Sequence, residues 1–155
     1  MNQREFAERV TAMQGSLYRV AASYLRGESD RLDAVAEAMA KAGEKLQTLR
    51  DEALFATWMT RILIRGCVDM QRRQKRMIPT DDVAERTAED EKVTALREAI
   101  DSLPQKARTM IVLHYMEGYD VREIAKMMGT TKGAVCAGLA RAREKLRAYL
   151  EEDER

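Results

Sequence analysis

Apolar side chains recur at alternating gaps of three and four residues along most of this chain, and this spacing limits the possible folds more than any other feature. In the first segment they are Phe6, Val10, Met13, Leu17, Val20 and Tyr24. Such gaps place side chains on one stripe of an α-helix. Only 8 glycines and 2 prolines are present, and 34% of residues are charged, which favours helices over sheets with many turns. The sequence therefore predicts an all-α protein.

Three helices are expected in the N-terminal part, which we assign to a first module over residues 1–77. The first helix should end at Gly27, and the second should begin with Ser29 or Asp30 as its N-cap. The third should stop before Pro79. The side chains expected in the core are Leu32, Val35 or Ala36, Met39 and Leu46 from the second helix, and Leu54, Phe55, Trp58, Ile62, Leu63 and Met70 from the third.

Residues 78–91 are rich in carboxylates and poor in apolar side chains, so we expect a solvated linker there. A second module should cover residues 92–155. Pro104 suits the first turn of a helix that ends at Gly118. The apolar residues expected to open this module are Val93, Leu96, Ile100 and Leu103, followed by Met110, Ile111 and His114 on the next helix.

The C-terminal part has the pattern of a helix-turn-helix. Asp120 and Glu123 have the spacing of a capping box, which predicts the start of a short helix, and Gly129 should close it. Thr130 or Thr131 can then cap a final helix. Its predicted buried positions are Val135, Leu139, Ala142, Leu146 and Tyr149 or Leu150. A short helix, a glycine turn and a basic second helix are typical of DNA-binding proteins.

The net charge of +1 hides a strong segregation of charge along the sequence. Residues 60–77 carry six basic side chains against one acidic, and residues 131–147 carry five against one. Between them, residues 81–91 carry six acidic side chains against one basic. Two basic segments separated by an acidic one are compatible with a nucleic-acid-binding protein despite the balanced total.

Several other classes of protein have little support in the sequence. No long apolar run or secretion signal is apparent, so we expect a cytoplasmic protein without membrane insertion. Cys67 and Cys136 lack the spacing of a zinc site and are expected to be free thiols, with no metal or cofactor. An enzyme would depend on His114, whose place beside Leu113 and Tyr115 is typical of a structural histidine.

The chain resembles the extracytoplasmic function sigma factors, bacterial transcription initiation factors of the sigma-70 family that consist of sigma regions two and four. The segments that resemble region two are LYR at 17–19, DAVAE at 33–37, FATWMTRI at 55–62, and Asp69 with RRQKR at 72–76. Those that resemble region four are LPQKAR at 103–108, LHYMEG at 113–118, EIA at 123–125, Gly129 and RAREKL at 141–146. The two matches occur in the family's order.

The resemblance implies that the protein binds core RNA polymerase and directs promoter recognition and DNA melting. The second helix would dock on the clamp helices of the largest polymerase subunit. The candidate contacts there are Asp33, Glu37, Met39 and Lys41. A solvated helix face is the alternative interpretation of these four residues. The family also implies that an anti-sigma factor can hold the protein inactive.

The third helix would lie against the −10 element of the promoter. The candidates for phosphate contact are Arg61, Arg65, Arg72, Arg73 and Arg76. The stretch 47–55 would receive a base flipped from the non-template strand. Trp58 could stack on that base, but its place on the apolar stripe favours core packing.

The final helix would enter the major groove at the −35 element, with candidate contacts at Lys132, Gly133, Cys136, Ala137, Arg141 and Arg143. Cys136, Ala137 and Gly138 stand where the family usually has Lys or Arg, Ser and Arg. An α-helix turns by 100° per residue. This period places four residues of the final helix farthest from the core, with basic side chains on either side of them: Gly133, Ala137, Ala140 and Glu144. Ala137 or Ala140 could touch thymine methyl groups, and a close approach to the groove or simple drift would explain Gly138.

Region two also departs from the family, because Ala36 and Gly66 stand where Gln and Asn are usual. We therefore keep a second hypothesis, a degenerate sigma-like helix-turn-helix protein that acts through a protein partner and reads DNA weakly or not at all.

Overall fold

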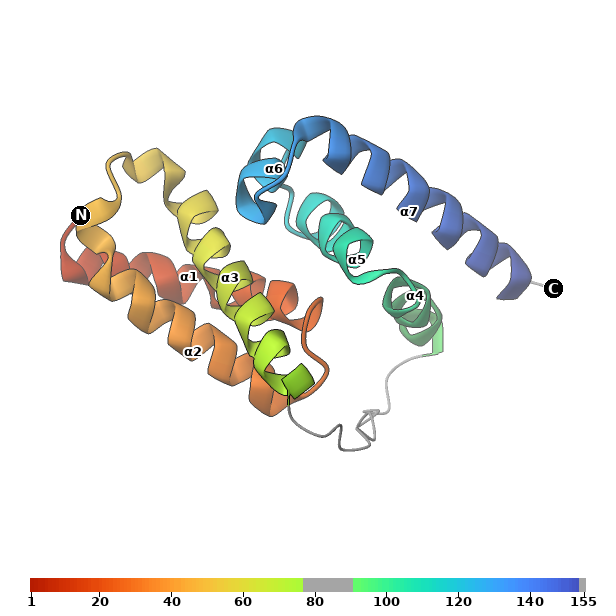
Figure 1. Ribbon diagram of the computed structural model, residues 1–155, viewed down its shortest axis with the longest axis horizontal. Helices are drawn as coiled ribbons and strands as arrows, with labels where there is room; N and C mark the ends of the chain where they lie inside the picture. The colour runs from red at the N-terminus through yellow and green to blue at the C-terminus, as the bar shows by residue number, and fades with distance from the viewer. Residues whose placement is uncertain (77–90, 154–155) are drawn as a thin grey trace. The chain divides into compact units, whose positions relative to one another are not determined.

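A computed structural model of the chain describes residues 1–76 and 91–153, and these residues form helices and no strand. The predicted linker therefore lies outside the described residues except for Glu91. The described helices fall into two compact units, one built from α1, α2 and α3 and the other mainly from α4 to α7 (Figure 1). The all-α prediction is confirmed.

The first unit contains α1 (Gln3–Ala22), α2 (Glu28–Glu44) and α3 (Phe55–Arg76). Each of the three helices packs against the other two (Figure 1). Two short 3₁₀ helices, η1 (Leu46–Thr48) and η2 (Glu52–Leu54), connect α2 to α3. We call residues 46–54 the connecting loop. The core of this unit consists of Val10, Leu17, Val20, Ala34, Val35, Ala38, Ala42, Phe55, Met59, Leu63, Ile64, Cys67 and Met70.

The boundary between α1 and α2 differs from the prediction. α1 ends at Ala22, and Tyr24 and Leu25, which follow it outside the helix, are themselves buried in the core. Gly27 has an extended conformation, φ −93° and ψ 143°, and is the N-cap of α2, so its prediction as the end of α1 is wrong. Ser29 and Asp30 lie within α2, and Asp30 accepts a hydrogen bond from Gln74 instead of capping the helix.

Two leucines predicted in this core are on the surface. Leu32 is 53% exposed, because α2 buries a narrow stripe of small residues, Ala34, Ala38 and Ala42, together with Val35. Side chains this small let neighbouring helices approach closely. Leu54, in η2, is 48% exposed because it precedes α3 and lies outside the periodic stripe of that helix.

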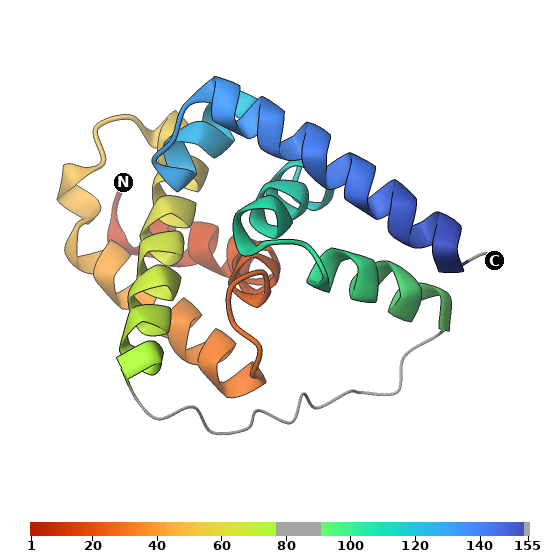
Figure 2. The ribbon, with the colours of Figure 1, turned by 45° about the vertical axis from the view of Figure 1, so that its right-hand side comes forward.

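The second unit contains α4 (Glu91–Asp101), α5 (Gln105–Ile111), the π-helical turn η3 (Val112–Met116), α6 (Val121–Met128) and α7 (Lys132–Asp153). α7 runs beside α4 and α5 (Figure 2). The core of this second unit includes Ala99, Leu103, Met110, Ile111, Val112, Leu113, Ile124, Val135, Leu139 and Ala142. Leu96 is 49% exposed, so its prediction as a core residue is wrong, whereas Ala99 of the same helix is fully buried.

The helix-turn-helix signals are confirmed one by one. The Asp120 carboxylate accepts a hydrogen bond from the Glu123 backbone N–H at 2.8 Å, and the Glu123 side chain accepts one from the Asp120 N–H at 3.4 Å. Gly129 ends α6 with φ +65°, a left-handed conformation that strongly favours glycine. The Thr131 hydroxyl accepts from the Ala134 N–H at 3.1 Å, which satisfies a donor in the first turn of α7.

Candidate nucleic-acid interface

One face of α3 is basic and open to solvent. Arg61, Arg65 and Arg72 are exposed, and their positions fall within about 40° of one another around the helix axis. The opposite face carries the buried Met59 and Leu63, which anchor α3 to α1 and α2. The predicted exposure of these arginines therefore follows directly from the helical period.

The other two predicted arginines lie further along α3. Arg73 is exposed, and its Nη2 atom lies 3.8 Å from a carboxylate oxygen of Glu37 on α2. Arg76 is the last residue of α3, and its side chain lies outside the described part of the chain. The structure thus gives α3 a row of three exposed arginines and a fourth that is shared with α2.

The side chain of Trp58 lies partly in the core and partly at the surface. Its ring packs against the buried Phe55, with 5.9 Å between ring centroids, yet the residue is only half-buried. Its position on α3 lies about 60° from that of Arg61, so its exposed part borders the basic face. Core packing therefore describes only one side of Trp58.

The candidate polymerase contacts on α2 divide into two groups. Asp33, Glu37 and Lys41 are exposed and follow one another at intervals of four residues, which places them along one line of the helix. Met39 is half-buried and lies on the other flank, next to the position of the exposed Leu32. Its helical spacing predicted Leu32 to be in the core, so Leu32 was not among the predicted residues of this surface.

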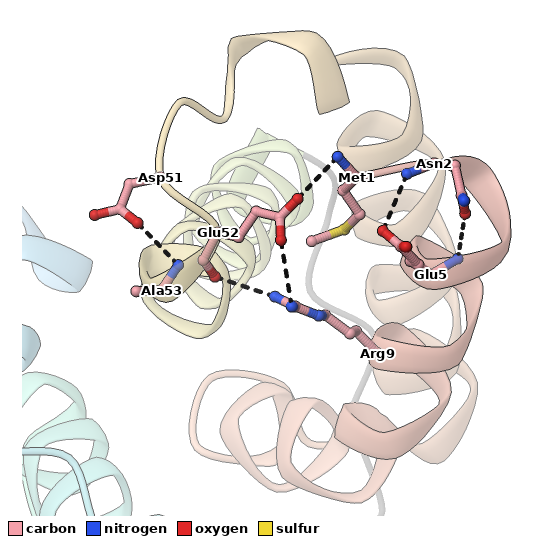
Figure 3. Close-up of polar contacts among 7 residues, drawn as sticks. All are labelled: Met1, Asn2, Glu5, Arg9, Asp51, Glu52 and Ala53. Atoms are coloured by element: carbon pink, nitrogen blue, oxygen red, sulfur yellow. Dashed lines mark hydrogen bonds and ion pairs between the residues drawn. The ribbon is translucent and has the colours of Figure 1, made fainter.

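The connecting loop before α3 is held by short-range and long-range contacts. The Thr48 hydroxyl donates to the Lys45 carbonyl at 2.6 Å, and the Asp51 carboxylate accepts from the Ala53 N–H at 3.0 Å. Glu52 interacts with Arg9 of α1, 43 residues earlier in the sequence (Figure 3). No local sequence signal indicates this contact.

The centre of the exposed face of α7 has three small residues and one glutamate between basic edges. Gly133, Ala137, Ala140 and Glu144 are exposed, as the helical period predicts. The remaining candidate side chains of α7 are exposed too, namely Lys132, Cys136, Arg141 and Arg143. The structure therefore brings all six candidate residues of α7 to the surface of one helix.

Arg143 has a partner that sequence reasoning missed. Its Nη1 atom donates a hydrogen bond of 2.6 Å to the phenol oxygen of Tyr115, in η3. The Tyr115 side chain is 54% exposed and packs edge-on against His114. The two residues are 28 positions apart, and a helical pattern within α7 carries no information about such a contact.

Gly138 faces the interior of the second unit. It is buried, and a Cβ atom at this position would collide with the sulfur atom of Met110 on α5. The expectation that a close approach to the DNA groove or drift would explain Gly138 is therefore wrong. Close packing of α7 on α5 requires a residue without a side chain there.

The two cysteines are free and differ in environment. Cys67 is buried in the first unit, and this burial raises the pKa of its thiol to about 12. Cys136 is exposed on α7. Among the residues that the structure describes, no group of three or more His, Cys, Asp or Glu side chains could hold a metal ion. Within the same residues, no helix is both long and apolar enough to span a membrane.

Comparisons with known proteins agree with this geometry. The model of Sigma-70 region 2 matches residues 9–77, and that of Sigma-70, region 4 matches residues 94–146. The chain is 31% identical over 150 residues to the RNA polymerase sigma factor SigV of Bacillus subtilis, covering 94% of this chain and 90% of that protein. It is 34% identical over 139 residues to the ECF RNA polymerase sigma factor SigM of Mycobacterium tuberculosis, covering 86% of this chain and 71% of that protein.

Solved structures give the same fold. CnrH in complex with the cytosolic domain of CnrY is 27% identical and superimposes with a TM-score of 0.77, covering 98% of this chain and 91% of CnrH. The sigma factor RpoE in complex with the anti-sigma factor NepR, from Bartonella quintana, superimposes with a TM-score of 0.81 at 18% identity, covering 96% of this chain and 98% of RpoE. The chain is a transcription initiation factor, and it belongs to the extracytoplasmic function group of the sigma-70 family.

Proposed function

We propose that three surfaces of this sigma factor divide the work of transcription initiation. α2 docks on core RNA polymerase, α3 and the connecting loop bind and open the −10 element, and α7 binds the −35 element. The row of exposed arginines on α3 is the observation that carries the proposal. A row of cations on one helix face suits a polyanion, because each phosphate contact releases condensed counterions.

The exposed part of Trp58 and the exposed side chain of Leu54 support a role of the connecting loop in strand opening. They lie where α3 begins, beside the row of arginines that would hold the backbone. Flipping a base out of the duplex costs a few kcal/mol. Stacking of a base on an aromatic side chain contributes about 1–3 kcal/mol, which is enough to offset much of that cost.

α7 suits recognition through shape and apolar contact more than through hydrogen bonds. Ala137 and Ala140 present methyl groups at the centre of its exposed face, and Arg141 and Arg143 lie toward its edges. Methyl groups can contact the methyl of thymine, while the arginines hold phosphates. We expect the −35 preference to be weaker than that of a helix with several base-reading donors.

An anti-sigma factor is a further partner that we propose for this chain. RpoE, which has the same fold, was solved in complex with the anti-sigma factor NepR. A protein that covered the exposed faces of α2 and α7 would block the surfaces that we assign to polymerase and DNA.

We assign no catalytic role to any side chain of this factor. His114 places its Nδ1 atom 2.9 Å from the Tyr119 carbonyl oxygen and its ring against Tyr115, contacts that serve the turn after α5. We place the action of the protein in the bacterial cytoplasm, where core polymerase and the chromosome are.

Reconstituted transcription tests the proposal. Purified protein is mixed with core RNA polymerase from the same bacterium, and runoff transcripts from genomic DNA are sequenced. We expect co-elution with core and transcripts that start downstream of a shared pair of elements, with core alone as the control. Absence of core association at low salt would contradict the assignment of α2. Core association without specific starts would favour the degenerate sigma-like alternative.

A further inference from the structure

The beginning of α1 is fastened to the connecting loop by one carboxylate. The guanidinium of Arg9 donates through Nη1 to the backbone carbonyl of Glu52 at 3.1 Å, and its Nη2 lies 3.6 Å from the Glu52 Oε2 atom. The terminal ammonium of Met1 lies 2.9 Å from the other carboxylate oxygen, Oε1 (Figure 3). Both oxygens of Glu52 are therefore engaged by cations of the N-terminal segment.

Arg9 also contacts the first residue of α3. Its guanidinium carbon lies 5.7 Å from the centroid of the Phe55 ring, which is 4% exposed. The ring of Phe6, one turn earlier on α1, packs nearly perpendicular to the same ring, with 6.0 Å between centroids. Arg9 thus holds two points of the chain, the carbonyl at residue 52 and the ring at residue 55, which bracket Leu54.

We propose that Arg9 is a positioning residue for strand opening, which acts through Glu52 on the connecting loop. The inference rests on the proposed function of that loop as the receptor of a flipped base. By fixing residues 52–55, Arg9 sets the direction of the exposed Leu54 and the approach to the half-buried Trp58. It affects which base is accepted and how readily the strands open, and it leaves the binding of duplex DNA and core unchanged.

The chemistry of arginine suits this role better than that of lysine. The planar guanidinium presents several N–H donors in fixed directions, so it can hold a carbonyl and a carboxylate together while its face rests on an aromatic ring. A lysine at position 9 would keep the charge and could bind one of these groups at a time. Arg9→Lys should therefore restore part of what Arg9→Ala loses.

A fluorescent base reports the opening step directly. 2-Aminopurine is placed in turn at each non-template position of the −10 element of a promoter found by runoff transcription, and the holoenzyme is added. Arg9→Ala, Arg9→Lys and Glu52→Gln are compared with wild type. Arg4→Ala is the matched control, because Arg4 is on the same helix, is 89% exposed and forms an ion pair with Glu8, one turn away, at 3.5 Å.

We expect Arg9→Ala to slow opening about tenfold and to reduce discrimination among the four bases at the flipped position. Glu52→Gln should give a smaller loss in the same direction, Arg9→Lys an intermediate one, and Arg4→Ala none. Core affinity and −35 footprints should stay at the wild-type level in all four variants, and circular dichroism at the assay temperature should confirm folding.

Unchanged opening and base discrimination in both Arg9→Ala and Glu52→Gln would overturn the inference. A parallel fall of core affinity, −35 protection and helical signal in Arg9→Ala, with normal opening by Glu52→Gln, would also overturn it, since Arg9 would then serve only stability. If the wild-type holoenzyme gave no signal at any −10 position, the proposed function of the loop itself would fail, and the inference with it.

Discussion

Arg73 of α3 and Glu37 of α2 form an ion pair, with 3.8 Å between Nη2 and the carboxylate oxygen. Both side chains are about half exposed, at 61% and 48%. The pair therefore joins the helix that we assign to polymerase with the helix that we assign to DNA. Because the ion pair is exposed to solvent, its contribution to the free energy of unfolding should not exceed about 1 kcal/mol. Either side chain can therefore exchange this partner for a more strongly interacting one.

Replacement of Glu37 should affect the two assigned surfaces in opposite directions. We expect Glu37→Gln to weaken binding to core polymerase and to strengthen −10 binding by at most about fivefold, because Arg73 loses its internal counterion. Filter binding to −10 DNA and fluorescence anisotropy with labelled core measure the two effects. Glu44→Gln, an exposed residue near the end of α2, is the control. Equal losses in both assays would point to unfolding instead.

Charge reversal on α3 should weaken promoter binding for every sequence. The double variant Arg72→Glu and Arg73→Glu removes two proposed phosphate contacts. The slope of log K against log salt should therefore become shallower by about 2, since each contact contributes roughly 0.9. Titration of promoter binding at several salt concentrations gives the slope, with Arg4→Glu on α1 as the control. A slope equal to that of wild type would refute phosphate contact by these arginines.

Aspartate at position 137 should abolish recognition by α7. Ala137 lies at the centre of the exposed face, where a carboxylate would meet the electronegative groove and the phosphates beside it. DNase footprints should lose protection at the −35 element. Ala148→Asp, on the same side of α7 three turns later, should leave the footprint intact. Survival of both footprints and transcription in Ala137→Asp would show that α7 does not read DNA.

The two thiols should differ strongly in reactivity. Native protein at pH 8 should consume one equivalent of Ellman's reagent at Cys136, and a second only after denaturation. Burial raises the pKa of Cys67 to about 12, so its thiolate is negligible until the pH approaches that value. Mass spectrometry of the modified peptides assigns the sites, and bound promoter DNA should protect Cys136. Rapid reaction of native Cys67 would contradict the packing of α3.

The two glycines of α7 should respond differently to alanine. At Gly133 a Cβ atom meets nothing within 4 Å, so Gly133→Ala should stabilise by up to about 1 kcal/mol through helix propensity. At Gly138 the added Cβ displaces the Met110 side chain, which should cancel that gain or reverse it by about 1–2 kcal/mol. Urea unfolding of both variants measures the difference.

The background variant Met110→Ala supplies the control for this comparison. With the methionine shortened, Gly138→Ala should regain most of the benefit seen at Gly133, because the two residues are in contact and their effects couple. If Gly138→Ala were as stabilising as Gly133→Ala in the unaltered background, the close packing of α7 on α5 would be disproved.

Local signals were read correctly in the helix-turn-helix but not at the boundary between α1 and α2, where Gly27, Ser29 and Asp30 took other roles. The capping box of Asp120 and Glu123 and the left-handed Gly129 depend only on their neighbours, and both are present. Exposure of Arg61, Arg65 and Arg72 follows from the helical period once the buried stripe is known. The start and end of α6 and the basic face of α3 were therefore predictable.

Features that depend on residues distant in the sequence could not be predicted. Leu32 and Leu96 fit a helical spacing, but the small residues Ala34, Ala38 and Ala99 fill the core in their place. Leu54 precedes α3 and lies outside its buried stripe. The partners of Arg73 and Arg143 lie on other helices, and the contact of Arg9 with Glu52 spans 43 residues. Spacing along one helix cannot reveal which side chain of another helix will meet it.

The hydrogen bond between Tyr115 and Arg143 bears on the entropy of the −35 contact that we propose for α7. An arginine side chain without a partner loses much rotational freedom when it binds a phosphate. The Arg143 side chain is already oriented by its hydrogen bond to the Tyr115 phenol, which uses one of its N–H groups. The remaining donors are prearranged, so less entropy is lost when DNA arrives. Part of the ordering that the proposed −35 contact requires is thereby completed during folding, before any promoter is encountered.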